Sequence, residues 1–283
     1  MTYYHVDVFS NQPFSGNGLT VFPGGESLSK SLMQTITQEM RQFESIFLQH
    51  RTGQVFDARV FTMEEELDFA GHPALGAAAV LHSLHRPMET EAEWELVFPS
   101  KRVPVRTQKR DHGYFSSMDQ GQAVFGKVLS DAENRAFQSA LGITSGDCDP
   151  RLYPLQVVST GLPYLIVPVK RNIEHAKIRV ENLEEKLLAI GAKFIGVLDV
   201  STRTIRTWDN SGQVEDIATG SLAGPAGAYM VRYDLCKIDE LILIHQGKNL
   251  ERESELFVQV SSLQNHVYVS ADVVSIASGC IRV

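Results

Sequence analysis

The chain has 283 residues, 43% hydrophobic and 21% charged, enough for one large or two medium domains with an ample core. Its net charge of −8 argues against a nucleic-acid or anionic-membrane binder, which would need a basic face. The three cysteines, Cys148, Cys236 and Cys280, are far apart and form no CxxC pair, which argues against a disulfide framework or a zinc site. We see no signal peptide and no membrane span, so we expect a cytoplasmic protein.

The first half of the sequence predicts many strands and two helices. Ser27 is a candidate N-cap for the first helix, whose apolar residues recur at helical spacing until a predicted end near Gln42. The second helix is headed by Gly71 and is expected to run to about Leu84. Apolar runs and alternation predict strands over residues 4–9, 19–22, 45–48, 56–61, 67–69, 94–98, 103–106 and 114–118.

The second half repeats this plan. Ser130 and Glu133 have the spacing of a capping box, and Gly142 stands where that helix would end. Another Gly-headed helix is predicted from Gly220 to about Tyr229. Strands are predicted over residues 155–159, 164–169, 194–200, 202–208, 241–245, 256–260 and 267–269.

This order is rich in strands and lacks βαβα alternation. It predicts an α+β fold of two similar domains, each a curved sheet around a central helix. A boundary near residues 120–122 would divide the chain into an N-terminal domain over 1–120 and a C-terminal domain over 121–283, with the last strand able to return to the first domain.

Two segments half a chain apart, residues 68–80 and 216–229, resemble each other. Each has an acid, then a Gly followed by a polar residue, then a Gly/Ala-rich run of helical character. A helix that starts in this way leaves its first N–H groups bare, and with the helix dipole behind them they form an anion site. We therefore expect two helix N-termini to face a shared cleft that binds a small carboxylate.

Glu44 is the first candidate catalytic residue, because it lies at a helix-to-strand junction with apolar neighbours. A carboxylate in an apolar pocket has its pKa raised toward neutrality, as general acid–base catalysis requires. The alternative is a solvated Glu at a helix end. His72 starts the first Gly-headed helix and could bind a carboxylate or shuttle a proton. It could also be a cap-like histidine bonded to backbone.

Asp216 precedes the second Gly-headed helix, and Ser221 opens it. Asp216 could pair with a substrate hydroxyl or assist proton transfer, or it could be an N-cap acid. Ser221 could donate to a bound anion or act as a plain cap. Arg203 and Arg206 could clamp a carboxylate, although paired basic residues on a strand are usually a solvated face. The sequence has no GxGxxG, Walker A, HExxH or GxSxG motif, so no pattern in it predicts a dinucleotide, nucleotide or metal site.

Taken in order, short motifs across nearly the whole chain resemble the PhzF family, the phenazine-biosynthesis-like isomerases related to diaminopimelate epimerase. Each motif is weak alone, but their order and spacing are specific. They lie at residues 4–9, 13–17, 43–45, 61–62, 66–73, 159–163, 216–221 and 246–247, with Arg252 and Ser254.

The resemblance implies two similar domains, each a β-barrel-like sheet wrapped around a helix, with the active site in the cleft between them. It also implies a homodimer. The family's catalytic glutamate falls on Glu44, and its Gly-His pair falls on Gly71 and His72. Its acid falls on Asp216, and its Gly-Ser pair falls on Gly220 and Ser221. The family's named reaction isomerises trans-2,3-dihydro-3-hydroxyanthranilate without a cofactor, and one carboxylate can remove a ring proton and return it to another carbon.

We therefore expect a cofactor-independent isomerase of a small, cyclic carboxylate. Glu44 is the general acid/base, and His72 and Asp216 assist protonation or orient the substrate. The N–H groups of Gly71, His72, Gly220 and Ser221 bind the carboxylate, and the Ser221 hydroxyl contributes to that binding.

Two alternatives remain open: a racemase or epimerase of an amino or hydroxy acid, with Glu44 opposed by His72 or Asp216, and a non-catalytic metabolite-binding protein. Diaminopimelate epimerase uses a cysteine from each half, whereas His72 and Ser221 stand at these helix starts, which disfavours a two-thiol racemase.

Five positions depart from the family's pattern. Family members usually carry Pro where this chain has Gly18. They often carry Pro where it has Met63, Ile217 and Glu253, and Thr where it has Ala74. None of these changes removes a proposed catalytic group, so they bear on the substrate more than on the mechanism.

Overall fold

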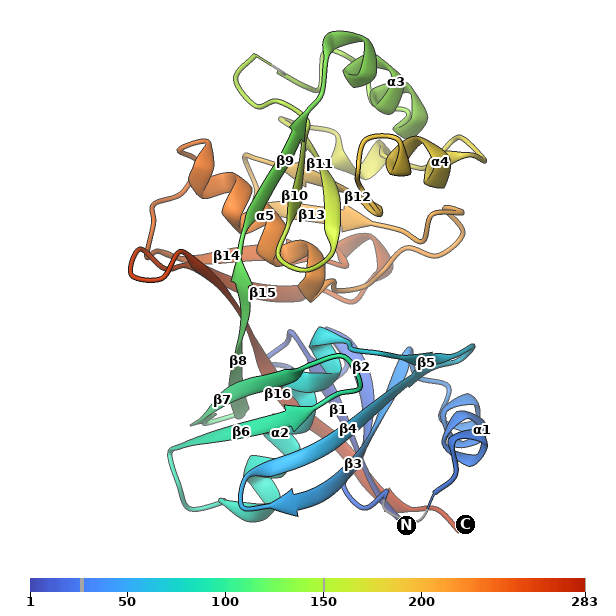
Figure 1. Ribbon diagram of the computed structural model, residues 1–283, viewed down its shortest axis with the longest axis vertical. Coiled ribbons are helices and arrows are strands. Elements are labelled where there is room, and N and C mark those ends of the chain that lie inside the picture. The colour runs from blue at the N-terminus through green and yellow to red at the C-terminus, as the bar shows by residue number, and fades with distance from the viewer. Residues whose placement is uncertain (26–27, 150, 283) are drawn as a thin grey trace. The chain divides into compact units, whose positions relative to one another are not determined.

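The computed structural model describes residues 1–25, 28–149 and 151–282. They form two compact units, the first comprising Met1–Asp119 with Ser270–Val283 and the second Gln120–Val269. Each unit is built on mixed parallel and antiparallel strands with few helices, as the strand-rich order predicts (Figure 1). Within the described part of the chain, no helix is long and apolar enough to cross a membrane.

The sheet of the first unit returns to its starting strand. Its hydrogen-bonded order is β1-β2-β3-β4-β6-β7-β8-β16, and β16 pairs antiparallel with β1 from Thr2↔Cys280 to Val8↔Val273. The elements are β1 (Thr2–Val8), β2 (Asn17–Phe22), α1 (Lys30–Met40), β3 (Glu44–Thr52), β4 (Val55–Thr62), β5 (Glu66–Leu67), α2 (Gly71–His85), β6 (Glu91–Val97), β7 (Arg102–Arg110), β8 (Gly113–Gln122) and β16 (His266–Cys280). The strands β8 and β16 each continue into the second unit.

Helix α1 covers β3 and β4 from outside the sheet (Figure 1). Its N-cap is Ser29, whose side chain accepts a hydrogen bond from the N–H of Leu32 at 3.3 Å. The sequence-predicted cap, Ser27, lies outside the described residues. The helix ends at Met40, two residues before the predicted end at Gln42. Its apolar face joins a cluster of Phe22, Met33, Ile36, Phe47 and Phe61.

Helix α2 is buried over most of its length and contacts β1, β2, β3, β6 and β7. Its Gly/Ala-rich composition permits this close approach, because small side chains let the backbone lie near the strands. A Cβ on Gly76 would stand 2.5 Å from Leu19 Cδ2 and 2.9 Å from Val8 Cγ2. His72 lies one turn before Gly76 on the same helix face, so this packing also places His72 against β2 and β3.

The second unit contains a sheet in the order β16-β15-β14-β13-β12-β11-β10-β9. Its further elements are β9 (Val124–Val128), α3 (Asp131–Leu141), β10 (Gln156–Ser159), β11 (Pro163–Val169), η1 (Ile173–His175), α4 (Leu183–Leu188), β12 (Phe194–Asp199), β13 (Thr204–Thr207), α5 (Gly220–Arg232), β14 (Leu241–Gln246), η2 (Lys248–Leu250) and β15 (Ser254–Val260). The predicted capping box of Ser130 and Glu133 is confirmed, and Gly142 ends α3 in the left-handed conformation.

Helix α5 is the buried helix of this unit and contacts β10, β11, β14 and β15. It too depends on a small residue, since a Cβ on Gly227 would stand 2.4 Å from Val258 Cγ1. The helix starts at Gly220 as predicted and extends to Arg232, beyond the predicted end at Tyr229.

Candidate functional site

The first unit brings Glu44 and His72 together. Glu44 is the first residue of β3 and lies in register with Leu19 of β2, the residue against which α2 packs at Gly76. His72 is the second residue of α2. His72 Nδ1 is 3.0 Å from Glu44 Oε2, and the two side chains are only 10% and 14% exposed.

Both members of this pair keep an unsatisfied polar atom. The 3.0 Å contact is within ion-pair distance but lacks the alignment of a hydrogen bond. Glu44 Oε2 is therefore a buried atom without a hydrogen bond, and the other ring nitrogen of the histidine, His72 Nε2, also has no hydrogen-bond partner among the described residues. Buried polar groups in folded proteins are nearly always satisfied, so two exceptions in one contact suggest groups that a ligand engages.

The start of α2 carries no side-chain cap. Its N-cap is Ala70, and no acidic residue stands in its first turn. Within the described residues, the N–H groups of Gly71 and His72 donate no hydrogen bond. Helices α1 and α3 differ, because Ser29 caps α1 and Ser130 caps α3. The bare start of α2 therefore has donors left for an anion.

The start of α5 is bare for a different reason. Its N-cap is Thr219, but the hydroxyl of Thr219 donates to Asp216 Oδ2 at 2.5 Å and does not cap the helix. Asp216 also accepts a 3.4 Å hydrogen bond from the N–H of Ala218. The N–H groups of Gly220 and Ser221 have no hydrogen-bond partner in the described part of the chain.

Gln246 holds the segment that leads into α5. Its Oε1 accepts from the N–H of Thr219 at 2.9 Å, and its Nε2 donates to the Asp216 carbonyl and to Thr219 Oγ1, each at 2.9 Å. Gln246 is 1% exposed. A Cβ on Gly247 would stand 2.7 Å from the Ile217 carbonyl oxygen, so only a glycine lets this segment approach the end of β14. The Gln-Gly pair thus fixes Asp216 and Thr219.

The purely structural roles considered for Asp216, Ser221 and His72 are wrong. Asp216 is not an N-cap acid, because the N-cap of α5 is Thr219. Ser221 is not a cap either, since it is the second helical residue and its hydroxyl bonds Tyr164 at 2.8 Å. His72 is not a cap-like histidine bonded to backbone, because its Nδ1 faces Glu44 and its Nε2 is unpaired.

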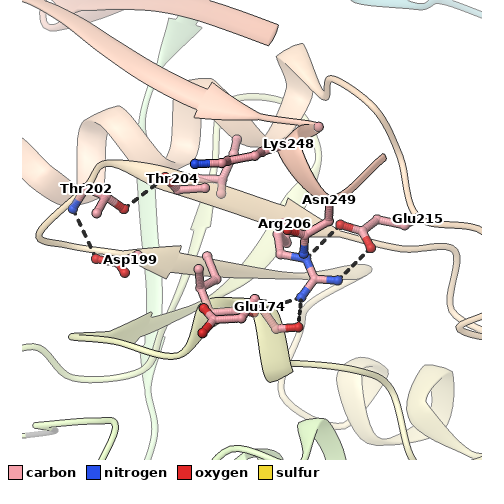
Figure 2. Close-up of a pocket in the computed structure, with 11 residues that line it drawn as sticks. Glu174, Asp199, Thr202, Thr204, Arg206, Glu215, Lys248 and Asn249 are labelled. Carbon is pink, nitrogen blue, oxygen red and sulfur yellow. Dashed lines mark hydrogen bonds and ion pairs between the residues drawn. The ribbon is translucent and has the colours of Figure 1, made fainter. Parts of the chain in front are cut away.

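A pocket of about 360 Å³ in the second unit is lined by none of Glu44, His72, Asp216, Gly220 and Ser221 (Figure 2). It is lined by Ile173, Glu174, Asp199, Thr202, Thr204, Ile205, Arg206, Glu215, Gly247, Lys248 and Asn249. Arg206, one of two arginines considered as a carboxylate clamp, makes two hydrogen bonds to Glu215, at 2.7 and 2.6 Å. Its Nη1 donates to the carbonyls of Ile173, Glu174 and Ala176. The Arg206 side chain therefore has a structural role: its hydrogen bonds fix the strand that precedes Asp216.

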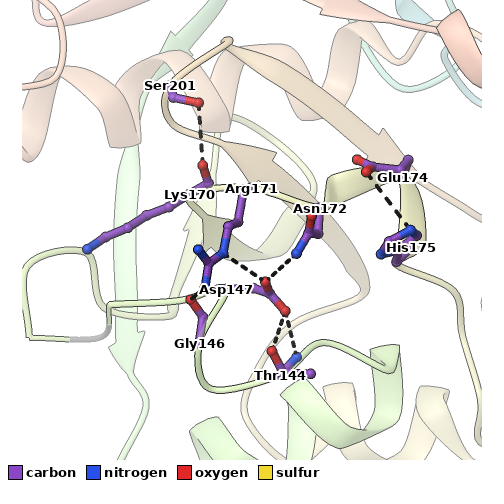
Figure 3. A network of polar contacts seen from close by, with 9 residues as sticks. All are labelled: Thr144, Gly146, Asp147, Lys170, Arg171, Asn172, Glu174, His175 and Ser201. Carbon is purple, nitrogen blue, oxygen red and sulfur yellow. Dashed lines mark hydrogen bonds and ion pairs between the residues drawn. The ribbon is translucent and has the colours of Figure 1, made fainter.

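A second polar cluster, around Asp147, is also structural (Figure 3). Asp147 accepts from the N–H and hydroxyl of Thr144, from Asn172 Nδ2 at 2.7 Å and from Arg171 Nε at 3.4 Å. The hydrogen bond from the Thr144 hydroxyl is the main cause that lowers the pKa of the Asp147 carboxyl. All its acceptor positions are occupied, so this acid ties two loops together.

The cysteines lie away from both helix starts in the sequence. Cys148 and Cys236 are buried, and burial raises the pKa of the Cys148 thiol to about 11. A thiol of this kind is a poor base or nucleophile near neutral pH. No group of three or more His, Cys, Asp or Glu side chains within residues 1–25, 28–149 and 151–282 is arranged to hold a metal ion.

One departure from the family's pattern, Gly18, lies beside a flexible side chain. Gly18 pairs with Asp7 in the β1–β2 ladder, and a Cβ there would stand 2.5 Å from Gln42 Oε1. A proline at this position would require the end of the flexible Gln42 side chain to move.

Three comparisons place the chain among known proteins. It is 31% identical over 277 residues to an uncharacterized isomerase, YddE, of Escherichia coli O157:H7, covering 93% of this chain and 91% of that protein. It is 30% identical over 296 residues to the trans-2,3-dihydro-3-hydroxyanthranilate isomerase of Pseudomonas fluorescens, covering 99% and 98%. The solved structure of a predicted epimerase, PA4716, from Pseudomonas aeruginosa matches with a TM-score of 0.92 at 44% identity, covering 100% and 99%.

A hydroxyproline epimerase from Agrobacterium vitis, 11% identical, matches with a TM-score of 0.60 over 98% of this chain and 92% of that one, which shows a likeness of fold. These relatives define the class of protein: an isomerase or epimerase on a racemase/epimerase-like fold. The family model for phenazine biosynthesis-like proteins, PhzC-PhzF, matches residues 6–279, and the chain belongs to that family. The family and the isomerase class expected from the sequence are thereby confirmed.

Sequence reasoning gave no role to three residues that the structure connects to the proposed site. Gln246 and Thr219 hold the segment of Asp216, and Tyr164 bonds Ser221. For Gln246 and Thr219 the only available signal was their position inside short motifs of the resemblance, which does not tell what a side chain contacts. Tyr164 directly follows such a motif and is not part of it.

Proposed function

We propose that this protein is a cofactor-independent isomerase that transfers a proton on a small, cyclic carboxylate, with chemistry like that of trans-2,3-dihydro-3-hydroxyanthranilate isomerase. The observation that carries the proposal is the contact of Glu44 and His72, two mostly buried side chains 3.0 Å apart that each keep a polar atom without a hydrogen bond. The name of the Pseudomonas fluorescens relative supports the substrate class.

In the first unit, Glu44 is the general acid/base. Its carboxylate removes a proton from one carbon and returns it to another, so no net proton is consumed. His72 is close enough to orient the carboxylate and to share its proton. The N–H groups of Gly71 and His72 stabilise negative charge that develops on the substrate.

In the second unit, Asp216 assists protonation or orients the substrate, and Thr219 and Gln246 hold it in place. The N–H groups of Gly220 and Ser221, with the Ser221 hydroxyl, bind the substrate carboxylate. The two N–H groups have no hydrogen-bond partner within the described residues, which supports this role.

We also propose that the two units follow one plan, a barrel-like sheet around a central helix. The burial of α2 and α5 and their contacts with several strands of their own units support this. The cytoplasmic location and the homodimer stay predictions. Light scattering on the purified protein would test the homodimer.

The experiment is proton NMR in deuterated water with a panel of small carboxylates that includes trans-2,3-dihydro-3-hydroxyanthranilate. Wild type is compared with Glu44→Gln and with a control, Glu66→Gln. Glu66 is a glutamate of the same unit with a 12% exposed side chain, but Arg59 and Lys30 pair with it. We expect deuterium incorporation by wild type and by the control, and none by Glu44→Gln.

The two alternatives give other outcomes in the same experiment. A racemase or epimerase would invert a stereocentre as deuterium enters, whereas the proposed isomerase moves hydrogen between carbons and leaves untouched stereocentres as they were. A metabolite-binding protein would bind a carboxylate of the panel without exchange. Full turnover by Glu44→Gln would contradict the proposed role of Glu44.

A further inference from the structure

Tyr164 makes a hydrogen bond whose direction decides how Ser221 meets an anion. The Tyr164 hydroxyl lies 2.8 Å from Ser221 Oγ, and either oxygen is able to donate. Tyr164 belongs to β11 and is 4% exposed, whereas Ser221 is partly exposed at the start of α5. Each hydroxyl has one proton, so only one of them donates along this contact.

The surroundings of Tyr164 settle the direction. Ser221 Oγ is the one hydrogen-bond partner of the Tyr164 hydroxyl within the described residues. If Ser221 donated, the buried phenol proton would have no acceptor, which costs free energy. Burial raises the pKa of Tyr164 well above its usual range, and the nearby Asp216 charge adds to this, so the phenol keeps its proton. Tyr164 is therefore the donor and Ser221 Oγ the acceptor.

We propose that Tyr164 is a positioning residue that, by donating to Ser221 Oγ, turns the Ser221 proton toward the carboxylate bound at the start of α5. This rests on the proposed function, in which Ser221 and the first N–H groups of α5 bind that carboxylate. The phenol, the serine hydroxyl and the carboxylate then form a chain in which each hydrogen bond polarises the next.

The ring of Tyr164 packs independently of its hydroxyl. Its centroid lies 5.4 Å from that of Phe194, on the neighbouring strand β12. Tyr164→Phe keeps this packing and removes only the donor. Tyr233→Phe is a matched control, because Tyr233 donates to Gln156 Oε1 at 2.9 Å in the same unit and has no proposed role in anion binding.

The test measures dissociation constants of benzoate and of its neutral isostere benzamide by calorimetry. We expect wild type to prefer benzoate. Ser221→Ala should weaken benzoate binding by about tenfold or more, as expected for loss of a hydrogen bond to a charged group. Tyr164→Phe should weaken it by about threefold to tenfold, because Ser221 keeps its hydroxyl but loses its direction. Benzamide binding should change little in either variant.

The double variant separates a positioning role from a general loss of structure. If Tyr164 acts through Ser221, then Tyr164→Phe adds no further loss to Ser221→Ala. Tyr233→Phe should bind both ligands as wild type does. The inference is overturned if Tyr164→Phe binds benzoate as wild type does, if the losses of the two variants add, if benzamide binding falls equally, or if wild type shows no preference for benzoate.

Failure of the proposed reaction would be recognised separately. Benzoate has no carbon-bound proton acidic enough for a carboxylate to remove, so its binding does not depend on the chemistry of Glu44. If no deuterium exchange is seen but the variants bind benzoate as predicted, the proposed isomerase activity is contradicted and the role of Tyr164 is supported. If wild type catalyses exchange but Tyr164→Phe binds benzoate as wild type does, the isomerase activity is supported and the role of Tyr164 is contradicted.

Discussion

Replacement of Gln246 by leucine should separate the folding of the second unit from the placement of Asp216. Leucine is similar in size to glutamine and keeps the packing of this 1% exposed position, but it makes none of the three hydrogen bonds to Asp216 and Thr219. The variant leaves the N–H of Thr219 buried without its acceptor and frees the Thr219 hydroxyl from its second partner.

The expected loss follows from these three bonds. A neutral hydrogen bond contributes about 0.5–1.5 kcal/mol to stability, and a buried group left without its partner lies at the upper end. Gln246→Leu should therefore lower the free energy of unfolding by about 2–4 kcal/mol. The folded fraction should also lose activity, because a displacement of about 1 Å in a catalytic group reduces rates by about a hundredfold.

The assay combines urea unfolding with initial rates on an exchangeable substrate, measured where both variants are fully folded. Gln156→Leu is the control, since Gln156 is a buried glutamine of the same unit with two hydrogen bonds, to Gly126 and from Tyr233. It should lose about 1–3 kcal/mol but keep the wild-type kcat/KM. Equal kcat/KM for wild type and Gln246→Leu would refute the inference that Gln246 holds Asp216 in an active position.

Other substitutions test the packing and charge arguments. Gly76→Ala should destabilise by up to about 2 kcal/mol, because the clash with Leu19 outweighs the helix propensity gained, and Leu19→Val should restore part of the loss in urea unfolding. Arg206→Met should cost about 3–5 kcal/mol in the same assay, since it leaves Glu215 as a mostly buried, unpaired carboxylate. Hydrogen bonding to Lys127 lowers the pKa of Glu133 from 4.5 to about 2, so its contribution to stability is present above pH 4.5 and lost as the pH falls toward 2. Glu133→Gln should therefore reduce the fall in unfolding free energy between pH 4.5 and 2. An unchanged fall would contradict this assignment.

Local patterns predicted the helices better than the edges of the sheets. The Gly-headed starts of α2 and α5 and the capping box of α3 are local features, and each begins where the sequence predicts. The last strand was predicted over residues 267–269 but spans His266–Cys280. It is buried on both faces over residues 269–274, so polar and apolar residues do not alternate there. The charged Asp272 also breaks the apolar run, and its burial depends on an ion pair with the distant Arg110.

Two further elements had no pattern to reveal them. The strand β9 is almost entirely exposed and therefore has no apolar face. The helix α4 has six residues, too few for a helical period to stand out.

In the candidate site, too, the sequence identifies single residues but not the contacts between them. Glu44 and His72 were identified one at a time, and their contact depends on how closely α2 packs on β2 at Gly76, a tertiary fact. Gln246 and Tyr164 act through hydrogen bonds to residues far along the chain, which no local pattern encodes.

The most direct test of the account is deuterium exchange into trans-2,3-dihydro-3-hydroxyanthranilate and related carboxylates, comparing wild type, Glu44→Gln and Glu66→Gln. The account predicts exchange with wild type and with Glu66→Gln, and exchange reduced to the uncatalysed level with Glu44→Gln. Exchange that survives in Glu44→Gln would contradict the assignment of Glu44 as the base that moves the proton.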